Sequence, residues 1–270
     1  MDLFKTVETD FPFDLPNRSD CTAKWLDYMR GYLITVPNGE MLYIEHFFDK
    51  KISDRTVEYF LENDTVDGRT AKWKEYSADT LSNIRFSNIK WKQDYIKLYG
   101  KVMPLPRLTS WYGDNEKTYT YSGIECIPNS WNKGLLYLKQ KIEHCAGVTF
   151  NSVLLNWYRD GQDSMNWHAD DEKELGRNPV IASANFGETR DFFVRRNDDP
   201  SLKIALPLKH GTLLIMRGEL QHYWQHSVPK RLKVGGSRFN LTFRRIGVNQ
   251  QGDTGELSAS DEYLLSHVHS

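Results

Sequence analysis

The middle and C-terminal parts of the chain contain short segments rich in β-branched and aromatic residues, separated by turn residues. The segments lie at residues 153–158, 180–186, 191–196, 203–208, 212–217 and 238–245. This composition predicts β-strands, because such side chains pack well on a pleated sheet. No helical pattern lies between most of these segments, so the sequence favours a sandwich or a jelly-roll barrel over a parallel sheet with crossover helices.

The segment RFNLTFR at 238–244 alternates strictly between polar and apolar residues. In a strand, this alternation places Arg238, Asn240, Thr242 and Arg244 on one face and the Phe and Leu side chains on the other. The apolar face can pack on a hydrophobic layer, whereas two guanidinium groups on a buried face need an anion. The alternative is an ordinary solvent-facing strand that carries two arginines.

A similar pattern occurs in VLLNWY at 153–158, where Asn156 and Tyr158 share one face of the predicted strand with Leu154. An amide and a phenol can complete the hydrogen bonds of a small dicarboxylate that the two arginines hold. The two strands together therefore suggest a site for a diacid.

Two segments have apolar residues at helical spacing. One runs from Ser53, a candidate cap, to about Leu61, and the other runs from Trp131 to Cys145 with Gly147 as its expected stop. We expect both helices to pack on the outside of the barrel. The overall prediction is a mainly β fold with flanking helices.

Composition limits the classes of protein that the chain can represent. It has 270 residues, a formal net charge of −1, 39% hydrophobic residues and 26% charged residues, which is typical of a folded domain. There is no apolar run long enough to span a membrane and no secretory signal pattern. Three cysteines at wide spacing indicate free thiols rather than a disulfide framework. The expectation is a cytoplasmic protein, or a nuclear one if the source is eukaryotic, and not a secreted one.

One of the eight histidines stands beside an acid at metal-ligand spacing. His168 and Asp170 are two residues apart, so both can project from one face of an extended chain. With one distant histidine they would form the facial triad that leaves coordination positions open on Fe(II). In HYWQH, spacing alone leaves His222 and His226 equally eligible as that third ligand. The alternative for the pair is a surface histidine beside solvated acids.

Taken in order, four motifs resemble the AlkB family of Fe(II)/2-oxoglutarate dioxygenases. They are NWYRDGQDSMNWHADDE, IASANFG, HGTLLIMRGELQHYWQHSVPK and RFNLTFR. The upstream PRLTSWYG and TYTYSG resemble the nucleotide-recognition region of the DNA-repair members. The similarity runs from about 106 to 246, roughly half of the chain.

The resemblance implies a double-stranded β-helix core with an N-terminal nucleotide-recognition extension. Residues 105–247 would form the dioxygenase domain. Residues 1–104 would form the extension and part of the recognition lid, and 248–270 would be a flexible polar tail.

The resemblance also implies how the site is built. His168, Asp170 and His226 would bind Fe(II), since the family ligand directly precedes a Ser-Val-Pro type of turn. The family pattern assigns four further residues to the cosubstrate 2-oxoglutarate. Arg238 and Tyr158 would hold its distal carboxylate, and Arg244 and Asn156 its metal-proximal end; O2 would take the remaining position.

The implied reaction is oxidative demethylation of N-alkylated bases of the 1-methyladenine and 3-methylcytosine type in single- or double-stranded DNA. Succinate, CO2 and formaldehyde would be released. The family pattern suggests five residues for the substrate: Tyr121 as a stacking ring, Tyr119, Glu172 and Asp171 near the base, and Arg107 as a phosphate contact. Arg190, Arg195 and Lys90 are further candidate phosphate contacts. RNA or protein as the substrate, and a catalytically silent barrel that binds nucleic acid, are the alternatives; neither a membrane nor an obligate protein partner is implied.

Overall fold

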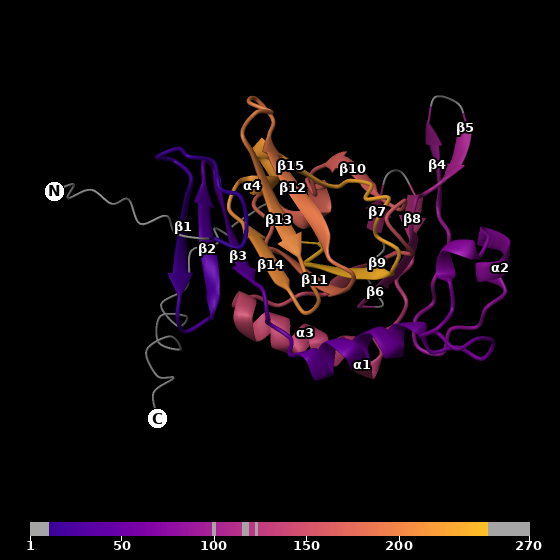
Figure 1. The fold of residues 1–270 in the computed structure, drawn as a ribbon. Helices are drawn as coiled ribbons and strands as arrows, with labels where there is room; N and C mark the ends of the chain where they lie inside the picture. The colour runs from indigo at the N-terminus through magenta and orange to yellow at the C-terminus, as the bar shows by residue number, and fades with distance from the viewer. Residues whose placement is uncertain (1–10, 99–100, 115–118, 122–123, 248–270) are drawn as a thin grey trace.

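The computed structural model describes residues 11–98, 101–114, 119–121 and 124–247, without the side chains of 78–79, 96–98, 119–121 and 124–126. Within these residues two antiparallel sheets stack on each other (Figure 1). The larger sheet has the strand order β1 (Thr22–Leu26), β2 (Gly31–Val36), β3 (Gly39–Ile44), β14 (Leu213–Arg217), β11 (Ile181–Gly187), β16 (Arg238–Arg244), β9 (Ser152–Tyr158) and β6 (Leu108–Gly113).

The smaller sheet completes the jelly roll. Its strand order is β10 (Met165–His168), β15 (Trp224–Val228), β12 (Arg190–Arg196) and β13 (Lys203–Leu208). Apolar residues of both sheets form a common buried cluster, in which Ile204 and Leu206 of β13 meet Leu214 and Met216 of β14. The predicted jelly-roll core is therefore confirmed, and all six predicted strands are present to within a residue or two at their ends.

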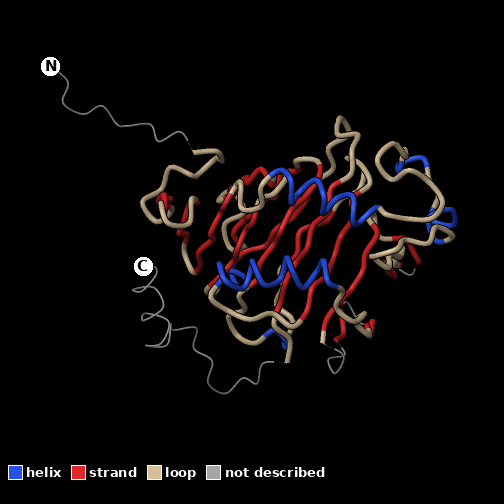
Figure 2. Tube along the Cα trace, turned by 90° about the horizontal axis from the view of Figure 1, so that it is seen from below, coloured by secondary structure: helices blue, strands red, loops and turns tan. Residues whose placement is uncertain are grey.

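Helices α1 (Lys50–Leu61) and α3 (Lys133–Ala146) cover the outer face of the larger sheet (Figure 2). Helix α3 begins after its cap Asn132, two residues later than the predicted start at Trp131. It ends at the predicted stop Gly147, whose φ of 68° is left-handed. The predicted start of the first helix was wrong. Asp49 accepts a hydrogen bond from the amide of Ile52 at 2.8 Å and caps the helix, whereas Ser53 is buried within it.

Shorter elements complete the described part of the chain. They are α2 (Ala78–Ser82), α4 (Leu220–Tyr223), the 3-10 turns at Trp73–Glu75 and Lys173–Leu175, and the hairpins β4–β5 (Tyr95–Leu98 and Lys101–Pro104) and β7–β8 (Tyr119–Tyr121 and Ile124–Cys126). Among the helices described here, none is long and apolar enough to cross a membrane.

The N-terminal strands are continuous with the barrel, because β3 pairs with β14 in the larger sheet. The predicted boundary between 1–104 and 105–247 thus does not separate the sheets, since strands from both sides of it share one ladder. The predicted tail at 248–270 lies outside the described residues.

The alternation predicted for β16 and β9 is confirmed. Phe239, Leu241 and Phe243 are buried in the cluster beneath the helices, together with Leu155 and Trp157 of β9. The polar side chains of both strands point to the opposite face, into the space between the two sheets. A single sheet face therefore carries the polar groups of the site.

Candidate metal and cosubstrate site

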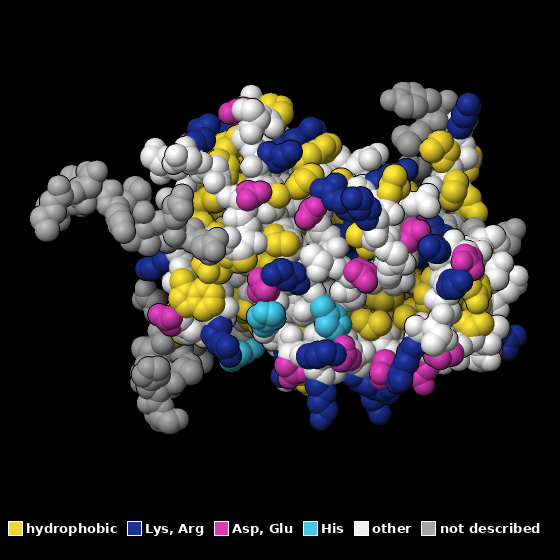
Figure 3. Space-filling view, viewed as in Figure 1, with side chains coloured by type: hydrophobic (Ala, Val, Ile, Leu, Met, Phe, Trp, Pro, Cys, Tyr) yellow, Lys and Arg dark blue, Asp and Glu magenta, His cyan; other side chains and the backbone are white. Residues whose placement is uncertain are grey.

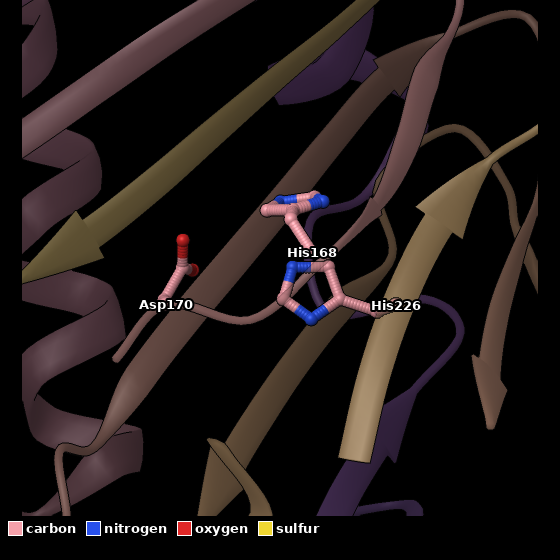
Figure 4. Close-up of side chains that lie close together, drawn as sticks. All are labelled: His168, Asp170 and His226. Carbon is pink, nitrogen blue, oxygen red and sulfur yellow. The ribbon is translucent and has the colours of Figure 1, made fainter. Parts of the chain in front are cut away.

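Three side chains meet between the sheets, as Figure 4 shows. His168 and His226 are direct partners in the pairing of β10 with β15, and their ring centroids are 4.1 Å apart. Asp170 follows His168 by two residues. One ligand atom from each residue lies within 4.8 Å of the other two, which is a separation that a single metal ion can bridge. The structure therefore brings together the triad that contains His226.

His222 lies outside this cluster. It is exposed, and a ring nitrogen contacts the backbone carbonyl of Arg177. The short helix α4 turns His222 away before β15 begins, so the two histidines of HYWQH do not share a face. The ambiguity that spacing left open is resolved in favour of His226.

The protonation states of the triad suit a divalent metal. Burial lowers the pKa of His226 to about 3, with His168 adding to the effect. Burial opposes ionisation of Asp170, but Arg244 and the two histidines outweigh it and lower the pKa of Asp170 to about 2. At neutral pH the site thus offers neutral imidazole and an ionised carboxylate, the forms in which these groups bind metals.

Neighbouring groups orient the triad. Nδ1 of His168 lies 2.8 Å from the carbonyl oxygen of Asn166, an arrangement that leaves Nε2 free for a metal. Arg244 donates to Oδ1 of Asp170 at 2.7 Å, and the amide N–H of Asp170 donates to Oε1 of Gln221 at 2.9 Å. Gln221 is a residue that sequence analysis missed, because nothing in its spacing relates it to Asp170, 51 residues away.

Arg238 stands at another position in the same cavity and is 2% exposed. Its guanidinium carbon lies 4.9 Å from the ring centroid of Tyr158, and burial lowers the pKa of Arg238 to about 10. Nε and Nη1 have no hydrogen-bond partner among the residues that the structure describes. A buried cation with unused donors is unfavourable unless an anion meets it, so this end of the cavity fits a carboxylate.

A row of amides crosses three adjacent strands of the larger sheet. The row consists of three residues opposite one another on β9, β16 and β11: Asn156, Asn240 and Asn185. Nδ2 of Asn156 donates to Oδ1 of Asn240, and Nδ2 of Asn240 donates to Oδ1 of Asn185, both at 3.3 Å. At one end of the row, Arg107 donates to Oδ1 of Asn156 at 2.8 Å. At the other, Arg238 donates to Oδ1 of Asn185 at 2.5 Å. Asn185 is another residue that the sequence prediction missed. The signal for it was present, because Ser183 and Asn185 alternate with apolar residues in IASANFG and so share one face of the strand.

The candidate phosphate contacts divide into two groups. Arg107 and Arg190 are only 3% and 2% exposed, so neither is at the surface where a phosphate could reach it. Arg190 instead donates to the carbonyl oxygens of Asp160, Asp163 and Pro229. Arg195 remains accessible, with its guanidinium carbon 4.0 Å from the ring centroid of Trp167.

The structure places only some of the predicted base contacts. Asp171 is exposed and Glu172 is partly buried directly after the triad aspartate. The side chains of Tyr119 and Tyr121 lie outside the described residues, so their predicted roles stay predictions.

Comparison with known proteins agrees with this geometry. The model of the 2OG-Fe(II) oxygenase superfamily matches residues 69–244, well over half of the chain. The chain belongs to this superfamily. The site has a triad that can hold a metal ion and a buried cation that fits a carboxylate, which agrees with a superfamily named for Fe(II) and 2-oxoglutarate.

Two groups of relatives bear AlkB names, which confirms the resemblance noted from the motifs. The chain is 44% identical over 191 residues to alpha-ketoglutarate-dependent dioxygenase alkB homolog 3 of Rattus norvegicus, covering 67% of this chain and 64% of the relative. It is 42% identical over 158 residues to DNA oxidative demethylase ALKBH2 of Homo sapiens, covering 56% of this chain and 60% of the relative. The matches thus span somewhat less than two thirds of these relatives.

Proposed function

We propose that this protein is an Fe(II)/2-oxoglutarate-dependent dioxygenase that removes methyl groups from N-alkylated bases in DNA. The methylated base, 2-oxoglutarate and O2 would yield the unmodified base, formaldehyde, succinate and CO2. The observation that carries the proposal is the His168, Asp170 and His226 triad, which shares one cavity with the buried cation Arg238. The similarity to a relative named as a DNA oxidative demethylase supports the choice of substrate.

The iron, when bound, supplies the activation of O2, and 2-oxoglutarate supplies two of the four electrons that O2 takes up. The protein's own groups bind and orient. His168, Asp170 and His226 hold the metal, and Arg238 pairs with the distal carboxylate of 2-oxoglutarate, with the phenol of Tyr158 beside it. Arg244 keeps Asp170 ionised and fixed in direction. The methyl carbon is oxidised to a hydroxymethyl group on nitrogen, which loses formaldehyde.

The substrate base must leave its stack to reach a site between two sheets, as in other enzymes that act on bases. The face in Figure 3 carries Lys and Arg interspersed with Asp and Glu rather than one broad basic patch. With a formal net charge of −1, affinity for DNA would come from local contacts and from the flipped base. Arg195, stacked on Trp167 next to His168, is an accessible cation that could contact a phosphate.

The test incubates the protein with Fe(II), 2-oxoglutarate and ascorbate and follows the intact mass of four probes together with the formation of succinate; binding of the DNA probes is measured separately. These are single- and double-stranded DNA with one 1-methyladenine or 3-methylcytosine, the matching RNA, and an N-methylated peptide. Conversion of DNA to the unmethylated mass supports the proposal. Conversion of RNA or the peptide alone moves the same chemistry to another substrate, and binding of DNA without turnover of 2-oxoglutarate indicates a silent barrel.

A further inference from the structure

Asn185 lies on β11 and is 1% exposed. Its amide group is held by the backbone, since Nδ2 donates to the carbonyl oxygens of Ser183 at 3.0 Å and of Thr212 at 3.3 Å. Two acceptors on the nitrogen side and a guanidinium on the oxygen side leave one consistent orientation of the amide. The carbonyl oxygen of Asn185 is therefore fixed in space, and it faces Arg238.

The guanidinium of Arg238 uses one of its donors on that oxygen, with Nη2 2.5 Å from Oδ1 of Asn185. One side of the cation lies near the ring of Tyr158, at 4.9 Å. Nε and Nη1 have no acceptor within the described part of the chain. An arginine side chain has many rotamers, so a hydrogen bond at its far end restricts which way the remaining N–H groups point.

We propose that Asn185 is a positioning residue, which aims the unused N–H groups of Arg238 at the distal carboxylate of 2-oxoglutarate. The inference rests on the proposed use of 2-oxoglutarate. Asn185 acts through Arg238, and its hydrogen bonds run to that guanidinium, to Asn240 and to backbone carbonyls rather than to the triad. Its loss should therefore weaken binding of the cosubstrate while leaving metal binding intact.

The experiment measures two dissociation constants by calorimetry under nitrogen: Mn(II) with the protein, and 2-oxoglutarate with the Mn(II)-loaded protein. The first variant is Asn185→Leu, which keeps the approximate volume and removes the acceptor. We expect the Kd of 2-oxoglutarate to rise about tenfold, which is about 1.4 kcal/mol and near the lower end of what a hydrogen bond to a charged group contributes. The Kd of Mn(II) should stay unchanged.

The matched control is Asn151→Leu. Asn151 directly precedes β9, and its side chain is also held by the backbone: Nδ2 donates to the carbonyl oxygen of Ile246 at 2.9 Å, and Oδ1 accepts from the amide of Ile246 at 2.7 Å. It does not line the cavity. This variant should lose stability but bind 2-oxoglutarate as the wild type does. Equal weakening in both variants, or parallel loss of Mn(II) and 2-oxoglutarate binding by Asn185→Leu, would show a merely structural role and overturn the inference.

A second variant covers the case in which Asn185→Leu does not fold. Asn185→Asp keeps an oxygen facing Arg238 but adds a negative charge that competes with the cosubstrate. This variant should raise the Kd of 2-oxoglutarate by at least as much as Asn185→Leu does. Wild-type affinity in Asn185→Asp would overturn the inference. If the wild type itself does not bind 2-oxoglutarate, the proposed function fails first, so the two failures are distinguishable.

Discussion

Replacing Arg238 by methionine should make the ligand-free protein more stable and destroy its response to 2-oxoglutarate. Burial lowers the pKa of Arg238 to about 10. Each pKa unit corresponds to about 1.4 kcal/mol, so a fall from the ordinary range near 12.5 costs the charged form on the order of 3 kcal/mol. The guanidinium is charged in both folded and unfolded chains at neutral pH. The penalty therefore lowers the free energy of unfolding at neutral pH. It is relieved only as the pH rises above about 10, where Arg238 of the folded chain loses its proton.

Arg238→Met removes this penalty but gives up the hydrogen bond to Asn185, which is worth about 1 kcal/mol or somewhat more. The net gain should be about 1–2 kcal/mol, and for a domain of this size the melting temperature should rise by a few degrees. The assay is thermal unfolding of wild type and variant at neutral pH, with Mn(II), with and without 2-oxoglutarate. The wild type should gain stability from 2-oxoglutarate and the variant should not. A lower melting temperature together with a retained response to 2-oxoglutarate would show that Arg238 is neither a destabilising buried charge nor a ligand of the cosubstrate.

Three further substitutions test other parts of the structure. Asp170→Asn removes the only charged ligand of the triad, so titration with Mn(II) should show a Kd raised by more than about 100-fold; an unchanged value would exclude Asp170 as a ligand. Gln221→Leu removes the acceptor for the Asp170 amide and should weaken Mn(II) binding about tenfold in the same titration, whereas wild-type affinity would show that Gln221 does not orient Asp170. Asn132→Ala removes the cap of α3 and should lower the free energy of unfolding in urea by about 1 kcal/mol without affecting Mn(II) affinity; no loss would contradict the capping role.

Local pattern was sufficient to predict the strands and the polar face of the site. A side-chain period of two fixes which residues share a face, so the alternation in RFNLTFR alone placed Arg238 and Arg244 together. Family resemblance then selected His226 over His222. Spacing could not make that choice, since it depends on where α4 ends and β15 begins.

What the sequence could not show depends on contacts between distant segments. Gln221 and Asp170 meet only because α4 leads into β15, which pairs with β10. The burial of Arg107 follows from the pairing of β6 with β9, which brings it to Asn156. Similarly, the cap of α1 was misplaced because Asp49 and Ser53 are both good capping residues, and only the backbone geometry distinguishes them.

The most direct test of the central claim measures the products on a single-stranded DNA that carries one 1-methyladenine. Succinate and formaldehyde are quantified in the same reaction, for the wild type and for His226→Ala. We expect one formaldehyde for each methyl group removed, succinate formation stimulated by the methylated DNA, and neither product from the variant. Demethylation that persists in His226→Ala, or that proceeds without succinate, would contradict it.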